Sequence, residues 1–555
     1  MRAKLWTVVL VLLLVGMIFS SCAPSPAPTS APAPAVQSTQ PPVVVTQIVE
    51  KPITVTQVVT QPVVAQPTPV KPVGTLTLAL SASPNSIDLP LASEREAQNA
   101  SWPMFDSLVW LNDQGKVVPA LATSWDISPD GKTYTFHLRQ GVSFSNGEPF
   151  TADSVIASWK HGQSKGMQWV EKWSVVTDVQ KVDDYTIKLV LSAPNVLLLR
   201  IIAQYWAMIP PKYLAQVGDD GFTAKPIGTG PFVLQEWIKD DRIVYKANPN
   251  YWVPGEPKVD TLIFRPVPDE STRIAAVQTG EVDIAPRLTS DEAQSLLGAP
   301  NLRILKYTVD REFYIAFNNM TSGKGQPTED VRVRQAMNYA VDRAAIIKSL
   351  FGGYGNLSTG LIAPNDMGYD TSIKPYPYDP VKAKQLLSDA GYPNGFSMDF
   401  ACPSGAYSHF EEVCQAVQEY LQKVGITTNL DIEESGHFWD LEGQKQLPPL
   451  FGDSWAETSG EAYPRLQGAL GGKDAAFSSW TDPKILDFLQ QIAATGDDTQ
   501  RAAIYGQLEK YMYDNPPFIY LYEPVTFEAV NNRVQAYAPR AAEEYYLQNT
   551  WVLTQ

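Results

Sequence analysis

The chain has 555 residues, with 59 acidic side chains against 43 Lys and Arg, and a formal net charge of -16. Because a phosphate backbone is bound by clustered cations, this balance argues against a nucleic-acid partner. Hydrophobic residues make up 44% and charged residues 18%, which is typical of a folded protein. Three Cys exclude a disulfide-dense scaffold, and four His leave little room for a His-built metal site. At roughly 100–200 residues per domain, two to four domains are expected.

Residues 1–22 have the layout of a signal peptide. Two basic residues precede an apolar run over residues 5–19, which is shorter than the roughly 20 residues of a membrane-spanning helix. Small residues then lead into Cys22, an arrangement that resembles a bacterial lipobox, although Phe19 stands where that pattern usually has Leu. We expect Cys22 to carry the lipid at the mature N-terminus. A plain secretory signal cut nearby is the alternative.

Residues 23–73 are predicted to form a disordered tether. Pro recurs throughout a segment otherwise rich in Ala, Ser, Thr, Val and Gln. Because Pro removes strand hydrogen-bond donors and favours extended polyproline conformation, a semi-rigid spacer is expected. A packed β repeat over residues 43–64 is the alternative, against which the Pro density argues. Lipid and spacer together predict an extracytoplasmic protein on the outer face of the cytoplasmic membrane, which contacts that membrane only through its lipid.

The first predicted elements after the tether are strands. Alternating Leu and small residues predict a half-buried strand over residues 75–80. Residues 125–127 and 132–138 flank a Pro-Asp-Gly turn and predict a hairpin, with alternate apolar side chains on one face and His137 on the other. Residues 185–191 predict another strand.

Helices follow with equally clear signals. Apolar residues at helical spacing predict helices over residues 328–350 and 410–424. Asp379 is expected to cap a third helix, with Pro380 at its first position. Residues 426–432 look like the strand that follows the second of these helices. Strands mixed with helices, without a 20–50-residue repeat, predict an α/β fold.

The common catalytic signatures are missing from the chain. We find no His-Glu-x-x-His, Cys-x-x-Cys, Gly-x-Ser-x-Gly or complete nucleotide-binding loop. The glycines at residues 352–355 and 471–472 do not complete any of these patterns. A glycosidase carboxylate pair leaves no short signature, so this absence only shifts the expectation away from an enzyme.

Several separate stretches agree on one family. They are GTLTL at residues 74–78, PALATSW at 119–125, SPDGKTYTFHLR at 128–139, GVSFSNGEPFTAD at 141–153, GTGPF at 228–232, NYW at 250–252, GEVD at 280–283, DVRVRQA at 330–336 and AVDR at 340–343. In this order they resemble the large ABC-transporter solute-binding proteins of the dipeptide, oligopeptide and nickel group, solute-binding protein family 5. The resemblance runs from about residue 74 to the C-terminus.

The resemblance implies a two-lobed, periplasmic-binding-protein-like α/β fold of type II, of the large class with an extra subdomain. Its mixed sheets would be flanked by helices, with a hinge between the lobes. The implied boundaries are lobe 1 over residues 74–309 with a subdomain at about 116–209, lobe 2 over 310–519, a return to lobe 1 over 520–555, and hinge crossings near 307–317 and 520–525.

The resemblance also implies a function. The chain would be a receptor that captures a peptide or similar small organic solute by closing its lobes and delivers it to the permease subunits of an ABC importer. It would act as a monomer, with no catalytic residue, cofactor or resident metal ion. Four alternatives stay open: an oligosaccharide ligand, a nickel chelate, a sensor role with the same fold, and an extracellular glycan or peptide hydrolase.

The family's peptide-anchoring segment is present but altered. In peptide-binding relatives an Asp three residues after a Trp pairs with the ligand's ammonium group; here the third residue after Trp455 is Thr458. Glu457 is one position short, and Asp453 and Glu461 lie nearby. These three carboxylates are therefore the candidates for an ammonium anchor, with a plain solvated carboxylate as the alternative.

Aromatic side chains offer a second set of candidates. Trp455, Trp439 and Tyr407 fall in or near the expected ligand segment, and their flat faces suit sugar rings or peptide side chains. For each of them core packing is the competing interpretation. His409 and His437 are the residues that a nickel ligand would need, although two unlinked His are a weak signal.

Cys402 and Cys414 complete the candidates. Cys402 ends a predicted strand and Cys414 lies on the apolar face of the next helix. Two Cys close in sequence in an extracytoplasmic protein are candidates for a disulfide. Two buried free thiols are the alternative.

Overall fold

A computed structural model describes residues 71–92, 94–112, 115–164, 167, 174–457, 460–475 and 477–553. The predicted signal peptide, the predicted lipid attachment at Cys22 and residues 23–70 of the predicted tether lie outside these described residues. Within them, no helix combines the length and the apolar character that crossing a membrane requires.

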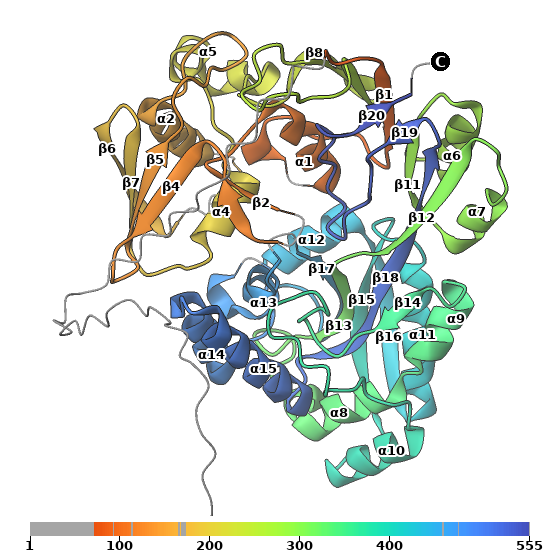
Figure 1. Cartoon of the computed structure of the whole chain (residues 1–555). Helices are drawn as coiled ribbons and strands as arrows, with labels where there is room; N and C mark the ends of the chain where they lie inside the picture. The colour runs from red at the N-terminus through yellow and green to blue at the C-terminus, as the bar shows by residue number, and fades with distance from the viewer. Residues whose placement is uncertain are drawn as a thin grey trace, which may run out of the picture. The chain divides into compact units, whose positions relative to one another are not determined.

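The folded chain is organised around one long strand, β18 (Phe518–Asn531). Its first half pairs with β13 (Arg311–Phe317) and β14 (Gly355–Leu357), and its second half with β12 (Leu302–Thr308) and β11 (Ile284–Leu288). The described residues thereby form a twelve-stranded mixed sheet in the order β16-β15-β17-β13-β18-β11-β1-β10-β9-β8, with β12 and β14 also paired to β18. β18 and the β12–β13 connection link the two halves of this sheet (Figure 1).

The first lobe is built on the half of the sheet beyond β18. Its other strands are β1 (Thr75–Leu80), β8 (Phe232–Ile238), β9 (Arg242–Ala247) and β10 (Thr261–Pro266). Its helices and short segments are η1 (Leu89–Leu91), α1 (Arg95–Ser101), η2 (Trp102–Met104), α5 (Pro211–Ala224), α6 (Glu270–Thr279), α7 (Ser290–Ser295), and the paired β19 (Val534–Gln535) and β20 (Trp551–Val552).

β1 is confirmed as a strand with the predicted bounds, but its predicted half burial is wrong. Its Leu side chains belong to one buried cluster, while Ala79, on the other face, belongs to a second cluster that α6 and α7 complete. Both faces are covered because β1 lies parallel to its neighbours β10 and β11 inside the sheet.

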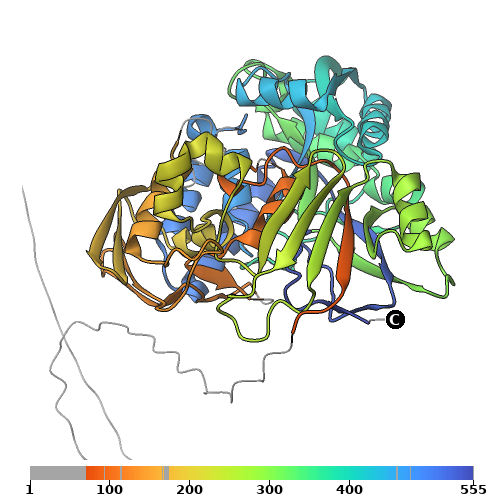
Figure 2. The same ribbon diagram turned by 90° about the horizontal axis from the view of Figure 1, so that it is seen from above.

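A four-stranded antiparallel sheet forms a separate core within the first half of the chain. Its order is β4-β5-β7-β6, with β4 (Ala122–Ile127), β5 (Thr133–Leu138), β6 (Val176–Asp183) and β7 (Thr186–Leu191) packed on α2 (Ala152–Gly162) and α4 (Leu198–Tyr205). The predicted hairpin is confirmed as β4 and β5, and the predicted 185–191 strand as β7. In both views this sheet lies on the opposite side of the first lobe from α6 and α7 (Figures 1 and 2). The hairpin β2 (Val109–Leu111) and β3 (Val117–Pro119) leads into it.

The second lobe packs helices on both faces of the remaining strands. These strands are β15 (Phe396–Ser404), β16 (Ile426–Glu434) and β17 (Leu450–Ala456). The helical segments are η3 (Pro327–Glu329), α8 (Val331–Ala340), α9 (Arg343–Leu350), α10 (Pro380–Asp389), α11 (Phe410–Lys423), α12 (Ser435–Gly443), α13 (Tyr463–Leu470), η4 (Gly472–Asp474), α14 (Pro483–Ala494) and α15 (Asp498–Asp514). They share one large buried core.

The structure has two helices where the sequence predicted one. The apolar spacing predicted a continuous helix over residues 328–350, but the chain breaks between α8 and α9 at extended Val341. Asp342 caps α9 by accepting from the backbone N–H of Ala345, so a cap signal inside the periodic pattern overrode the periodicity. The predicted cap of α10 by Asp379 and the predicted helix α11 are confirmed.

Candidate functional site

A cavity of about 770 Å³ lies between the two lobes. Ligand pockets in proteins range over about 300–1,000 Å³, so this volume suits a small organic solute. The first lobe contributes Leu111, Asn112 and Gly115 next to the β2–β3 hairpin, the second lobe contributes Asp310, Asn365, Glu457 and Gly460, and the rest of the lining comes from residues 536–550.

Residues 536–550 connect β19 to β20 with no regular secondary structure. Ala536 (φ 54°) and Glu543 (φ 56°) adopt the left-handed backbone conformation that non-glycine residues seldom take. Such conformations persist only where the surrounding structure imposes them, and they cluster at binding and catalytic sites. The segment therefore has a defined backbone conformation where it lines the cavity.

The charged wall of the second lobe centres on Asp310 and Glu457. Glu457 is 4% exposed, and its backbone N–H donates to the backbone oxygen of Asp310 at 3.1 Å. The Asp310 carboxylate accepts from the fully buried Arg465, which also lies 3.7 Å from Asp366. Burial alone would lower the pKa of Arg465, but Asp310, Asp366 and Glu312 hold it above its ordinary value. Burial raises the pKa of Asp366 to about 8 and the pKa of Glu312 well above its ordinary value, so these two acids add little negative charge near neutral pH. Asp310 and Glu457 are the acidic side chains of this wall that line the cavity.

The facing wall carries Arg540, Glu544 and Tyr546. The Arg540 guanidinium lies 4.6 Å from the ring centre of Tyr546, and its Nη1 lies 3.6 Å from Oε2 of Glu544. Burial raises the pKa of Glu544 to about 7, and the nearby Glu457 raises it in the same direction. The cavity therefore presents acidic groups on both walls and a guanidinium on one, an arrangement suited to a ligand with an ammonium group and a carboxylate.

Arg200 and Glu461 tie the lobes together at the edge of the cavity. Arg200, on α4, donates to the backbone oxygen of Gly115 at 2.7 Å, and its Nε lies 3.2 Å from Oε1 of Glu461. Glu461 is fully buried and also accepts from Arg501 at 2.9 and 3.1 Å and from the hydroxyl of Tyr505 at 3.0 Å. Glu461 was predicted as a ligand contact, but these donors already occupy its carboxylate, so Glu461 is not part of the proposed ligand site.

The predicted carboxylate Asp453 also lies away from the cavity lining. It sits on β17, is 3% exposed, and pairs in register with Tyr314 of β13. Burial raises the pKa of Asp453 to about 7, with Trp439 and Glu442 as hydrogen-bonding neighbours. The predicted aromatic Trp439 is thus half-buried against the core of the second lobe, beside Asp453.

The other two predicted aromatic residues also pack within the second lobe. Trp455 lies against α13 so closely that a Cβ on Gly468 would come within 2.2 Å of the indole ring. Tyr407 packs edge-to-face on Phe313, with ring centres 5.0 Å apart. Of the six predicted ligand-binding residues, the structure brings only Glu457 to the described lining of the cavity.

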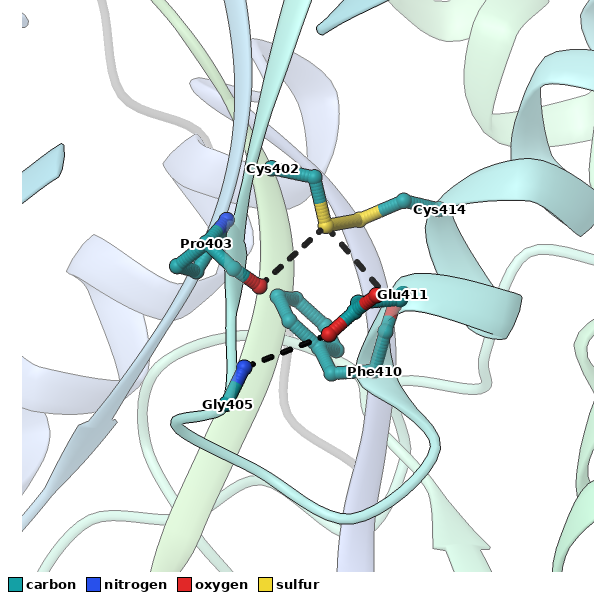
Figure 3. The surroundings of a disulfide bond; sticks show 6 residues. All are labelled: Cys402, Pro403, Gly405, Phe410, Glu411 and Cys414. Atoms are coloured by element: carbon teal, nitrogen blue, oxygen red, sulfur yellow. Dashed lines mark hydrogen bonds between the residues drawn. A yellow bond between two sulfur atoms is a disulfide. The ribbon is translucent and has the colours of Figure 1, made fainter. Parts of the chain in front are cut away.

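Cys402 at the end of β15 and Cys414 of α11 are joined in a disulfide (Figure 3). Both residues are fully buried, and the bond ties a strand to the helix that follows it. His409 and His437, the residues that the nickel alternative would need, lie near Glu412 and Glu433, at 3.7 and 3.9 Å. In the described part of the chain, no three His, Cys, Asp or Glu side chains are grouped to hold a metal ion.

Sequence analysis missed the cavity residues of the C-terminal segment. Arg540, Glu544 and Tyr546 have no helical or strand spacing and match no motif. The available signal was the length of the unpatterned stretch itself, because long irregular segments in compact domains are usually functional.

The chain matches the family model of bacterial extracellular solute-binding proteins, family 5, over residues 116–477. It is 31% identical over 458 residues to the glutathione-binding protein GsiB of Escherichia coli K12, covering 80% of this chain and 88% of that protein. Among solved structures, it resembles AgaA of A. tumefaciens R10 in complex with agropinic acid (TM-score 0.76, 28% identity, 87% of this chain and 99% of that one). It also resembles the periplasmic binding protein DppA of Helicobacter pylori in complex with the peptide STSA (TM-score 0.75, 26% identity, 86% and 98%).

These matches confirm both the predicted two-lobed periplasmic-binding-protein fold and the predicted family. The family model covers more than half of the chain, and the relatives align over nearly their full lengths. The chain therefore belongs to family 5 of the bacterial extracellular solute-binding proteins of ABC transporters.

Proposed function

We propose that this protein captures a short peptide or a peptide-like solute in the cavity between its lobes and delivers it to an ABC importer. The observation that carries the proposal is the interlobe cavity, with carboxylates on both walls and Arg540 on one. The names of the relatives support it: one binds glutathione and another holds the peptide STSA. Both ligands carry free ammonium and carboxylate groups.

Glu457 is the proposed ammonium anchor. It lines the cavity, is almost fully buried, and lies on the acidic wall beside Asp310. Charge-assisted hydrogen bonds from an ammonium group to a buried carboxylate are short and strong. Arg540, on the facing wall, is the proposed partner of the ligand carboxylate. The Trp455 and Trp439 that an oligosaccharide would stack on are packed elsewhere in the second lobe, so the peptide-type ligand is favoured.

Closure and anchoring complete the proposal. Residues 74–309 with 520–555, and residues 310–519, would move as two bodies about β18 and the β12–β13 connection, with a ligand that contacts both favouring the closed state. A lipid on Cys22 and the spacer over residues 23–73 would hold the receptor near its permease.

The direct test is binding and turnover on the purified full chain. Calorimetry with tri-alanine and glutathione should give saturable binding, a ligand at 100 times its Kd should stabilise the folded protein by about 2.7 kcal/mol, and chromatography should find the ligand unchanged. Cleavage of the peptide would instead support the hydrolase alternative. No binding of either compound, together with no peptide released from the protein as purified, would refute the proposal.

A variant at the anchor sharpens the test. Glu457→Gln should weaken tri-alanine binding about 10- to 100-fold, because hydrogen bonds to charged groups contribute about 1.5–3 kcal/mol. Glu419→Gln, an exposed carboxylate on α11, is the matched control and should bind as the unmodified protein does. Equal affinities in the two variants would exclude Glu457 as the anchor.

A further inference from the structure

A second, smaller cavity of about 120 Å³ lies inside the first lobe, next to the interlobe cavity. Its walls are rich in aromatic side chains, which include Trp102, Phe105, Trp110, Trp206 and Tyr251. A cavity of about 150 Å³ with apolar walls is large enough to hold benzene. The smaller cavity is therefore of the right order to hold one aromatic ring.

The two cavities adjoin through a shared rim. Leu111, Arg540, Tyr546 and Gln548 line both of them. Two contacts hold Tyr546 at this rim. Its ring stacks on that of Trp102 with ring centres 5.5 Å apart, and the Arg540 guanidinium lies 4.6 Å from its ring centre. A ligand in the interlobe cavity can thus extend one side chain past Tyr546 into the aromatic cavity.

Gln204 supplies an acceptor in this cavity. The residue lines the cavity and is 3% exposed, and its Oε1 is buried without a hydrogen-bond partner among the described residues. Its Nε2 donates to Oε1 of Glu544 at 3.5 Å. A buried acceptor left unpaired is costly, so a donor on the ligand would be favoured there.

The carboxylate at this site is already paired within the protein. Asp106 also lines the cavity, but its carboxylate accepts from Thr229 at 2.9 Å, Trp252 at 2.8 Å and Tyr251 at 3.2 Å. These bonds stay within the protein, whereas Oε1 of Gln204 is a buried acceptor without a partner among the described residues.

We propose that the aromatic cavity is a specificity subsite that takes a tyrosine-type side chain of the bound peptide, with the phenol hydroxyl donating to Oε1 of Gln204. The inference rests on the proposed function for the rest of the ligand. It adds a preference that neither the cavity between the lobes nor its charged walls would impose.

The test compares peptides that differ in one side chain. Calorimetry on the full chain would use tri-alanine, the three tripeptides with Tyr replacing one Ala, and the three Phe counterparts. One Tyr peptide should bind at least tenfold more tightly than tri-alanine, and its Phe counterpart should fall between them, because the ring alone gains burial but leaves Gln204 unpaired. Equal binding of all seven would overturn the proposal.

Two variants separate the ring from its hydroxyl. Gln204→Leu keeps the shape and should abolish the Tyr-over-Phe preference while the preference for a ring over Ala remains. Ala203→Leu, which fills the cavity from α4, should abolish both while tri-alanine binding is unchanged. The exposed Gln216→Leu and Ala224→Leu on α5 are the controls. An unchanged Tyr-over-Phe ratio in Gln204→Leu would overturn the assignment of Gln204.

A separate probe distinguishes failure of this inference from failure of the proposed function. If no peptide binds, the proposed function fails, and the cavity is then judged with 4-methylphenol against toluene by ligand-observed magnetic resonance. Saturable binding of 4-methylphenol that is lost in Ala203→Leu supports the subsite. Absence of that binding overturns it.

Discussion

Removing the Arg200 side chain should weaken ligand binding although Arg200 is absent from the described cavity lining. Arg200→Gln removes two contacts of the Arg200 guanidinium. One is its hydrogen bond to the backbone oxygen of Gly115, within the first lobe, and the other is its ion pair with Glu461 of the second lobe. A ligand held between the lobes binds to the state in which the lobes are in contact. A bond that joins the lobes raises the population of that state and therefore the apparent affinity for the ligand.

The size of the effect follows from the contacts that remain. Losing one partner of a buried ion pair costs about 3–5 kcal/mol when the other charge is left unpaired. Glu461 keeps two bonds from Arg501 and one from Tyr505, so the loss should approach the smaller value for one charged hydrogen bond, about 1.5–3 kcal/mol. Affinity should therefore fall about 10- to 100-fold.

The assay is calorimetric titration of the full chain with the tightest-binding tripeptide, paired with thermal unfolding of the ligand-free protein. Arg501→Gln is the matched control, because Arg501 contacts the same carboxylate from within the second lobe. It should lower the melting temperature more than Arg200→Gln does, yet change affinity less. If Arg200→Gln binds as tightly as the unmodified protein, the interlobe bond does not contribute to capture and the reasoning is refuted.

Two further predictions concern stability. Breaking the Cys402–Cys414 disulfide, which spans 12 residues of sequence, should cost about 3 kcal/mol on the loop-entropy estimate; denaturant unfolding with and without reductant measures it, and an unchanged midpoint after verified reduction would contradict it. His161, almost fully buried, has ring nitrogens 2.9 Å from Asp88 and 2.7 Å from Asp219; burial would lower the pKa of His161, but these partners raise it above its ordinary value. Its stabilising contribution is thus complete below the unfolded pKa of about 6.5 and declines as pH rises through the folded pKa. His161→Gln should lower the melting temperature more at pH 6 than at pH 9, and an equal or larger loss at pH 9 would contradict the sign.

Local elements followed from the sequence because their causes are local. The alternation in residues 75–80, the Pro-Asp-Gly turn before β5 and the Asp379 cap of α10 are each formed by neighbours within a few residues. The exception at Asp342 has the same origin, since a cap competed with the apolar periodicity over the same residues. The order of motifs along the chain was enough to indicate the family and its fold.

The binding site depended on long-range packing. Asp310, Glu457 and Arg540 come from segments up to 230 residues apart, and only pairing of β18 with strands of both lobes brings them around one cavity. The sequence by itself determined several of the helices and strands, the α/β class and the two-lobed family, since these depend on local spacing and on motif order. The tertiary structure alone decided that Glu461 joins the lobes, that Trp439 and Trp455 pack half-buried against the core of the second lobe, and that residues 536–550 form a cavity wall. Charge and aromatic character are visible in a sequence, but whether a side chain faces a ligand or a neighbouring side chain is set by residues far away along the chain.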